Sequence, residues 1–128
     1  MATDFKFDGG LTCALGVRDI NESVKWYDEK LGFELAYKMD DIGWAEVKSS
    51  VDRVFIGFSQ VDKVETKGGP TLTFGVKDIE KARKTLEQQG VRFDGEIVEY
   101  PGMVKLTTFY DPDGHKLMFY QSLSNGQQ

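Results

Sequence analysis

Two stretches of the chain share one pattern of hydrophobic and polar positions. The hexapeptide LGVRDI at residues 15–20 returns as FGVKDI at residues 74–79. Around each copy, apolar residues alternate with small or polar ones, which is typical of a β-strand with two different faces. After each aspartate, apolar residues recur at helical spacing. The repetition predicts two similar halves within one domain.

Each predicted helix has start and stop signals. Asp19 is expected to cap the first helix, with Glu22 completing a capping box, and Gly32 to end it. Asp78 and Gly90 take the same places around the second helix. The apolar stripes of the two helices comprise Ile20, Val24, Tyr27 and Leu31 in the first and Ile79, Ala82 and Leu86 in the second.

Three further strand-like stretches follow each helix, so the pattern predicts an α+β fold made of two βαβββ modules. These strands are expected near 33–39, 43–48 and 53–59 in the first half, and near 91–98, 103–110 and 115–121 in the second.

The strand that precedes each helix has a bulky apolar face and a face of small residues. We expect the bulky faces, such as Leu15 with Val17 and Leu72 with Phe74, to pack under the helices. The opposite faces should leave space for a ligand. They carry Thr12, Ala14 and Gly16 in the first half and Thr71, Thr73 and Gly75 in the second.

The length and the spacing of these elements indicate one domain over residues 1–128. We place module one at about 9–60, a polar, glycine-rich linker at about 61–69 and module two at about 70–122.

Composition excludes several classes of protein. Hydrophobic residues make up 40% and charged residues 29%, as in ordinary globular domains, and no apolar run is long enough to cross a membrane. A cytoplasmic protein that does not bind membranes is expected. The single Cys13 offers neither an internal disulfide nor a thiolate metal cage, and we interpret it as a small buried hydrophobe.

The net charge is −5 and the sequence has no cluster of basic residues, which argues against nucleic acid as a partner. A small hydrophobic or cationic ligand suits this charge better.

Three features of the chain resemble the vicinal oxygen chelate superfamily. They are the two βαβββ modules, the segment LGVRDINESVKWYDEKLGFELAY and the segment FYDPDGHKLMFYQ. This superfamily includes glyoxalase I, extradiol dioxygenases, fosfomycin-resistance enzymes and metal-free bleomycin-resistance proteins. The resemblance covers residues 9–122 and implies that each module curls its sheet into a half-barrel cup with the helices outside. It implies that two such modules pair either within one chain or across a dimer. It also implies a homodimer.

Metal-dependent members hold a divalent cation through histidine or glutamate on the first and last strand of each module. The resemblance places these four positions at Thr12, Gly57 (Ile56 if the register differs by one), Thr71 and Met118. None is a good ligand for a divalent ion, so we expect no metal and no cofactor. A nonstandard site built from Glu34, Glu46 or Asp52 is the alternative.

The only histidine follows the turn signal DPDG at residues 111–114. Pro112 and Gly114 suit a type I turn, which makes His115 the first residue of the returning strand. We expect an exposed imidazole with a structural role.

The residues expected to contact a ligand combine small side chains with aromatic, thioether and charged ones. Trp44 is the favoured contact, Glu46 could pair with a cationic group, and Lys105 with an anion or with Glu46. The alternative for the aromatic members is ordinary core packing. The set is Thr12, Ala14, Trp44, Glu46, Phe55, Gly57, Thr71, Thr73, Met103, Lys105, Met118 and Tyr120.

The function predicted from these residues is metal-free binding of an aromatic or cationic compound, as in bleomycin-resistance proteins. One alternative is an enzyme of the glyoxalase, lyase or dioxygenase type with a nonstandard metal site. Another is metal-free acid–base catalysis by Glu46 with Tyr120 or Lys105.

Overall fold

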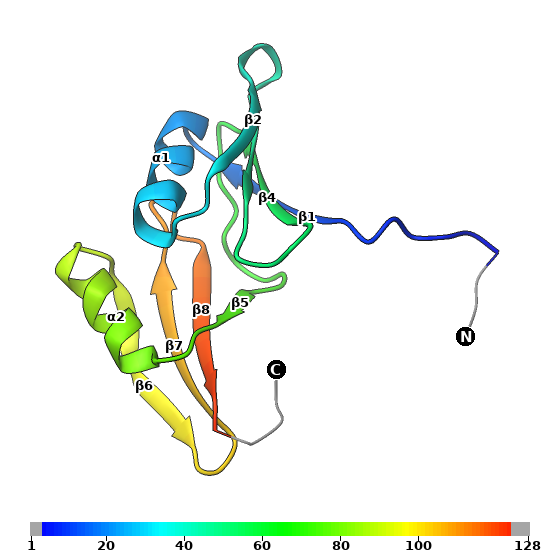
Figure 1. Ribbon diagram of the computed structural model, residues 1–128. Helices are drawn as coiled ribbons and strands as arrows, with labels where there is room; N and C mark the ends of the chain where they lie inside the picture. Colours follow the sequence, from blue (N-terminus) through cyan, green and yellow to red (C-terminus); the bar gives the residue numbers. More distant parts are fainter. Residues whose placement is uncertain (1–3, 124–128) are drawn as a thin grey trace. The chain divides into compact units, whose positions relative to one another are not determined.

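The computed structural model describes residues 4–123 and divides into two compact units (Figure 1). Unit 1 is Met1–Val64 and unit 2 is Glu65–Gln128. The division lies within the segment predicted as the linker. Each unit contains one α-helix and one four-stranded sheet.

Unit 1 has the predicted βαβββ order with a short 3₁₀ helix added. Its sheet has the strand order β1-β4-β3-β2, in which β1 runs parallel to β4 and the other neighbours are antiparallel. The elements are β1 (Leu11–Val17), α1 (Ile20–Leu31), β2 (Leu35–Met39), η1 (Asp40–Ile42), β3 (Trp44–Lys48) and β4 (Val54–Gln60).

Unit 2 repeats this topology with the strand order β5-β8-β7-β6, and β5 is parallel to β8. The predicted α+β class is therefore confirmed in both halves. The elements are β5 (Leu72–Gly75), α2 (Ile79–Gln88), β6 (Phe93–Tyr100), β7 (Val104–Tyr110) and β8 (Lys116–Ser122).

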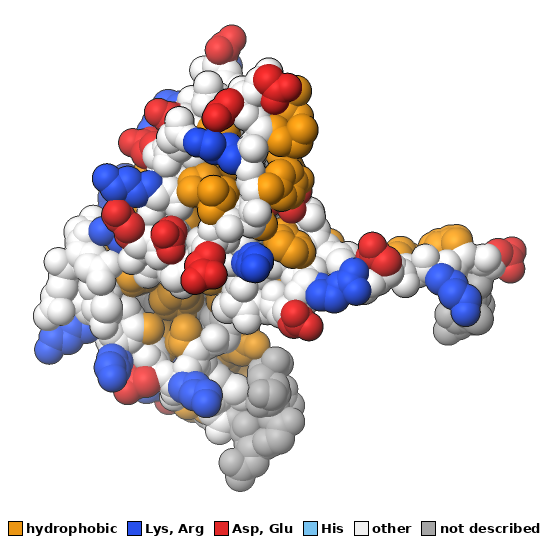
Figure 2. All heavy atoms as spheres, turned by 45° about the horizontal axis from the view of Figure 1, so that its top comes forward, with side chains coloured by type: hydrophobic (Ala, Val, Ile, Leu, Met, Phe, Trp, Pro, Cys, Tyr) orange, Lys and Arg blue, Asp and Glu red, His pale blue; other side chains and the backbone are white. Residues whose placement is uncertain are grey.

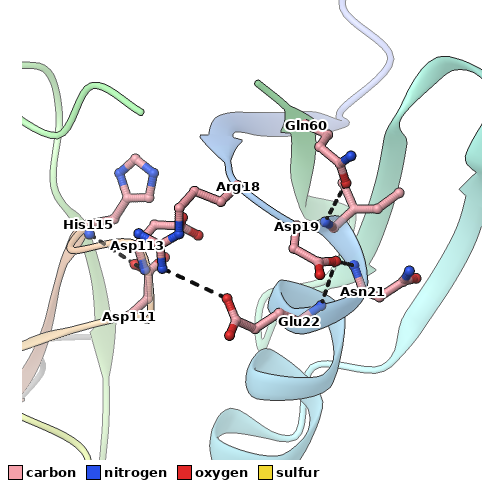
Figure 3. Close-up of polar contacts among 9 residues, drawn as sticks. Arg18, Asp19, Asn21, Glu22, Gln60, Asp111, Asp113 and His115 are labelled. Carbon is pink, nitrogen blue, oxygen red and sulfur yellow. Dashed lines mark hydrogen bonds and ion pairs between the residues drawn. The ribbon is translucent and has the colours of Figure 1, made fainter. Parts of the chain in front are cut away.

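The predicted helix ends are confirmed. The Asp19 carboxylate accepts the amides of Asn21 at 2.9 Å and Glu22 at 3.3 Å, and Gly32 ends α1 at a φ of 74° (Figure 3). The Glu22 carboxylate, expected to complete a capping box, lies 3.9 Å from the Arg18 guanidinium. At α2 the Asp78 carboxylate accepts the Lys81 amide, and Gly90 follows the helix with a φ of 84°.

The helix α1 covers one face of its sheet through aromatic packing. The Tyr27 ring lies 4.9 Å from the Phe58 ring, centroid to centroid, and both residues are fully buried. Because Phe58 pairs with Leu15 and Ala45 in the sheet, this face is the one that carries the bulky row of β1, as expected. Cys13 shares that face but is half-buried rather than buried.

Arg83 fixes α2, a role that its place in the sequence does not reveal. The Arg83 side chain, only 12% exposed, donates hydrogen bonds to the Thr107 hydroxyl at 2.8 Å and to the Gly95 carbonyl at 2.7 Å. It also binds the Glu87 carboxylate and lies 4.6 Å from the centre of the Phe93 ring. One arginine therefore joins the helix to both β6 and β7.

A glutamine at the end of a strand completes the start of each helix, a second feature that the sequence did not reveal. The Gln60 side-chain oxygen accepts the Ile20 amide at 3.1 Å (Figure 3), and the Gln121 oxygen accepts the Ile79 amide at 2.8 Å. These are first-turn amides, which have no partner inside a helix. The two units thus share the same connection between helix and sheet.

Replacing Gln121 with alanine should destabilise unit 2 by about 1 kcal/mol, because the Ile79 amide, in a buried residue, loses its acceptor. Urea unfolding followed by far-UV circular dichroism measures the change. Gln121→Glu is the matched control, since it keeps an acceptor oxygen next to the positive end of the helix dipole. Equal losses in the two variants would contradict this account.

The turn at residues 111–114 forms as predicted, but its surroundings do not match the expectation. The Gly114 amide bonds the Asp111 carbonyl at 3.0 Å, with a φ of 93° at Gly114. The Asp111 carboxylate accepts the amides of Asp113 and His115, each at 2.9 Å (Figure 3). His115 precedes β8 and is 9% exposed, so the prediction of an exposed histidine is wrong. Asp111 and Asp113 are also buried, so the turn is packed rather than projecting.

Across residues 4–123, no helix has both the length and the apolar character that crossing a bilayer requires.

Candidate ligand-binding site

The sheet face of unit 1 that points away from α1 is called the open face here. Strand pairing aligns Tyr37 with Glu46, Glu46 with Gly57, and Gly57 with Ala14, so these four residues form one row across the sheet. The six candidates of module one all lie on this face: Thr12, Ala14, Trp44, Glu46, Phe55 and Gly57.

An aromatic ring occupies the space that the small residues were expected to leave. A Cβ atom added to Gly57 would lie 2.2 Å from the Trp44 ring atom Cη2. The indole therefore rests against the backbone of β4, which only a glycine at this position permits. The expectation of an empty space at Gly57 is wrong, because a neighbouring side chain fills it.

Three side chains on β2 and β3 form a hydrogen-bonded group, the Tyr–Trp–Glu cluster, made of Tyr37, Trp44 and Glu46. The Tyr37 hydroxyl donates to Glu46 Oε2 at 2.6 Å. Trp44 Nε1 lies 3.0 Å from the Tyr37 hydroxyl and 3.2 Å from Glu46 Oε2. The hydrogen bond to Glu46 raises the pKa of Tyr37 above its ordinary value, so the phenol keeps its proton at neutral pH.

Tyr37 is the residue of this cluster that is not among the predicted ligand contacts. A signal for it existed in the hairpin. The loop of residues 40–43 pairs Met39 with Trp44. Two residues further from the loop on each strand, Tyr37 pairs with Glu46.

The open face of unit 1 is unusually apolar for a sheet surface in contact with water. Such a face normally carries polar residues. Here Tyr37 is 44% exposed and Met39 is 43% exposed, and Ile42 of η1 is exposed beside them. Figure 2 shows hydrophobic side chains exposed next to acidic ones at the upper end of the view. Contiguous exposed apolar patches are typical of interaction sites, which makes this face the candidate site.

Unit 2 also has an open face, opposite α2. Thr73 pairs with Met118 and Gly75 with Tyr120, so these predicted candidates lie together. A Cβ atom added to Gly75 would lie 2.9 Å from the Tyr120 ring, which again fills the space above a glycine. Thr71 lies just before β5, where its carbonyl accepts the Thr73 hydroxyl.

Two predicted contacts are not on this face. Lys105 pairs with Gln121 and shares a face with buried Thr107 under α2, where its ammonium binds the Glu80 carboxylate. That hydrogen bond raises the pKa of Lys105. Met103 lies in the turn before β7 and is exposed. The odd-numbered residues of β7 therefore face α2, and the face predicted for Lys105 is wrong.

Unit 2 contains its own tyrosine–carboxylate pair. The Tyr110 hydroxyl donates to Asp94 Oδ2 at 2.8 Å, and this bond raises the pKa of Tyr110. The Arg92 guanidinium lies 4.5 Å from the centre of the Tyr110 ring. A cation of the chain therefore accompanies this pair.

The positions that would hold a metal in this kind of fold do not suit one. Thr12 and Gly57 in unit 1, and Thr71 and Met118 in unit 2, offer weak or soft donors or none, and the Trp44 ring rests on Gly57. Within residues 4–123, no three or more His, Cys, Asp or Glu side chains are grouped to hold an ion, and Glu34 and Asp52 form no such group with Glu46. The residues present do not fit a divalent cation.

Comparison with known proteins identifies relatives over nearly the whole chain. The family model described as the glyoxalase/bleomycin resistance protein/dioxygenase superfamily matches residues 11–119. Lactoylglutathione lyase of Oryza sativa subsp. japonica is 26% identical over 119 residues, which cover 81% of this chain and 41% of that protein. The chain thus spans about two-fifths of the length of this curated relative.

Solved structures share the fold. A superfamily member from Sphaerobacter thermophilus DSM 20745 has a TM-score of 0.77 at 22% identity, covering 91% of this chain and 98% of that one. TnmS3, an antibiotic-binding protein from Streptomyces sp. CB03234, has a TM-score of 0.76 at 19% identity, with coverages of 92% and 98%. An integron cassette protein from the Halifax Harbour sewage outfall metagenome has a TM-score of 0.74 at 26% identity, with coverages of 90% and 99%.

Proposed function

The chain belongs to the glyoxalase/bleomycin resistance protein/dioxygenase superfamily, and from this premise we propose that it binds a planar, largely apolar small molecule without using a metal ion. The observation that carries the proposal is the apolar open face of unit 1, on which the Trp44 indole rests against Gly57. The family model confirms the superfamily expected from the sequence. The ligand is our proposal.

The arrangement of Trp44 suits stacking. The six-membered ring of the indole rests against the backbone of β4, and Trp44 is only half-buried, so part of the ring remains accessible to a ligand. Its Nε1 hydrogen is already bound within the Tyr–Trp–Glu cluster, which holds the ring in one orientation. A ring that is fixed before binding loses little conformational entropy when a flat ligand stacks on it.

The neighbouring side chains support the same kind of ligand. Met39 pairs with Trp44 across the hairpin and supplies a flexible thioether beside the ring. Thr12 and Ala14 are small and exposed on β1, so they do not block the approach to the central row. An apolar surface with few, well-placed polar groups is typical of small-molecule sites.

The proposed function predicts that the neutral planar dye Nile red binds in buffer containing EDTA. Trp44→Ala should weaken this binding about tenfold or more, because it removes the stacking surface. Nile red emission measures the affinity. Trp26→Phe is the matched control, since Trp26 lies on α1, and its affinity should stay within about twofold of the wild type.

Two results would contradict the proposal: binding that disappears with EDTA, or equal affinities in the Trp44→Ala variant and the wild type.

The likeness to the rice lactoylglutathione lyase favours a second candidate, a lyase-type enzyme with a nonstandard metal site. Native mass spectrometry of protein purified without added ions distinguishes the two functions. Stoichiometric iron, manganese, nickel or zinc would favour the enzyme, and a bound organic molecule without metal would favour the binding protein.

A further inference from the structure

We infer that Glu46 recognises a positively charged group of the bound molecule, a protonated or alkylated amine, with the rings of Trp44 and Tyr37 beside it. This inference rests on the proposed function and adds the charge of the ligand and the residue that selects it.

The first step concerns the two oxygens of the Glu46 carboxylate. The Tyr37 hydroxyl and Trp44 Nε1 both reach Oε2, at 2.6 and 3.2 Å. Among residues 4–123, no donor bonds Oε1. The carboxylate is thus held in place by one oxygen while the other can accept a hydrogen bond from a ligand. Such a charge-assisted bond is stronger than a neutral one.

The second step concerns the aromatic rings. Trp44 is two residues from Glu46 on the same face of β3, and Tyr37 lies directly opposite on β2. The faces of tryptophan and tyrosine rings attract cations. A carboxylate at the edge of two such rings therefore favours an alkylammonium group over a neutral or anionic one.

The third step concerns the charges around Glu46. Lys48 is the nearest basic residue on the same face of β3, in the next row of the sheet, where it pairs with Phe55. Lys38 lies on the other face, with its ammonium at Asn21 and Asp40. Glu46 forms no ion pair with any residue between 4 and 123, so its charge is available to a ligand.

The tyrosine–carboxylate pair of unit 2 differs from that of unit 1 because a basic side chain of the protein stacks on its tyrosine. Arg92 lies over the ring of Tyr110, whose hydroxyl binds Asp94, so a cation of the chain already stacks on the tyrosine of this pair. Asp94 therefore makes a matched control for Glu46. It has the same kind of hydrogen bond on the other unit, and its replacement changes the net charge by the same amount.

The experiment compares two planar dyes, the cation ethidium and neutral Nile red. Glu46→Gln should lower the affinity for ethidium about tenfold, because it removes the negative charge but keeps an acceptor for Tyr37 and Trp44. Its affinity for Nile red should change less than about twofold. Asp94→Asn should leave both affinities unchanged. Fluorescence titration in EDTA gives the six affinities, those of the wild type and the two variants for each dye.

Failure of the inference and failure of the proposed function look different. If Nile red binds but Glu46→Gln leaves the ratio of the two affinities unchanged, the inference is wrong and the proposed function stands. An equal loss of ethidium binding in Asp94→Asn would also overturn the inference, because it would show a general effect of net charge. If neither dye binds the wild-type protein, the proposed function fails, and the inference fails with it.

Discussion

Replacing Arg83 with alanine should lower the free energy of unfolding of unit 2 by about 2–4 kcal/mol. The guanidinium binds the Thr107 hydroxyl, the Gly95 carbonyl and the Glu87 carboxylate, and it covers the Phe93 ring. Hydrogen bonds to a charged group contribute more than neutral ones. Thr107 is 2% exposed, so water cannot replace the lost donor at its hydroxyl.

Urea unfolding followed by far-UV circular dichroism tests this expectation. Arg92→Ala is the control, because Arg92 is an exposed arginine stacked on a single ring, and its loss should cost less than about 1 kcal/mol. Arg83→Lys should recover only part of the stability, since an ammonium cannot reproduce the fork of the guanidinium. The role assigned to Arg83 would be wrong if the two alanine variants were equally stable.

Phe58→Ala should destabilise unit 1 by about 3–5 kcal/mol, the usual cost of removing a fully buried phenylalanine ring. Phe58 lies on β4 between Leu15 and Ala45, and its ring contacts Tyr27 of α1. Removing it leaves a cavity where the helix meets the sheet. Phe58→Leu, which keeps most of the volume, should cost less than half as much.

Tryptophan fluorescence reports this change selectively. Both tryptophans of the chain, Trp26 and Trp44, belong to unit 1. The fluorescence transition should therefore follow Phe58→Ala, while circular dichroism follows both units. A fluorescence midpoint in Phe58→Ala no lower than in Phe58→Leu would contradict the packing described for α1.

The features that the sequence predicted well depend on neighbouring residues. Asp19 and Gly32 delimit α1, and Asp78 caps α2, because a cap needs only a short side chain or a glycine within one turn of the helix. The turn at 111–114 likewise follows from its own residues, with Asp111 bonding amides two and four positions away.

The features that the sequence did not reveal depend on residues far apart along the chain. Gln60 and Ile20 are 40 positions apart, and Arg83 and Thr107 are 24 positions apart. An arginine inside an amphipathic helix is normally predicted to be exposed to solvent. The partners of Arg83 lie on β6 and β7 and come close to it only in the folded unit.

The candidate site was predicted where strand alternation was unambiguous. In unit 1, the six expected residues share one face because the alternation of small and bulky residues along β1 and β4 distinguishes the two faces. In β7, apolar and polar residues do not alternate in a way that identifies the face under the helix, and Lys105 was placed on the wrong face. Alternation also cannot show that the ring of Trp44 leans over Gly57, since that depends on side-chain torsions.

All strand pairing among the described residues stays within one unit or the other, with β1 and β4 joining in the first and β5 and β8 in the second. A substitution on one sheet therefore disturbs no backbone ladder of its counterpart. The two βαβββ units can therefore change in sequence separately. One unit can acquire a specialised group of side chains, such as the Tyr–Trp–Glu cluster, without a matching change in the other.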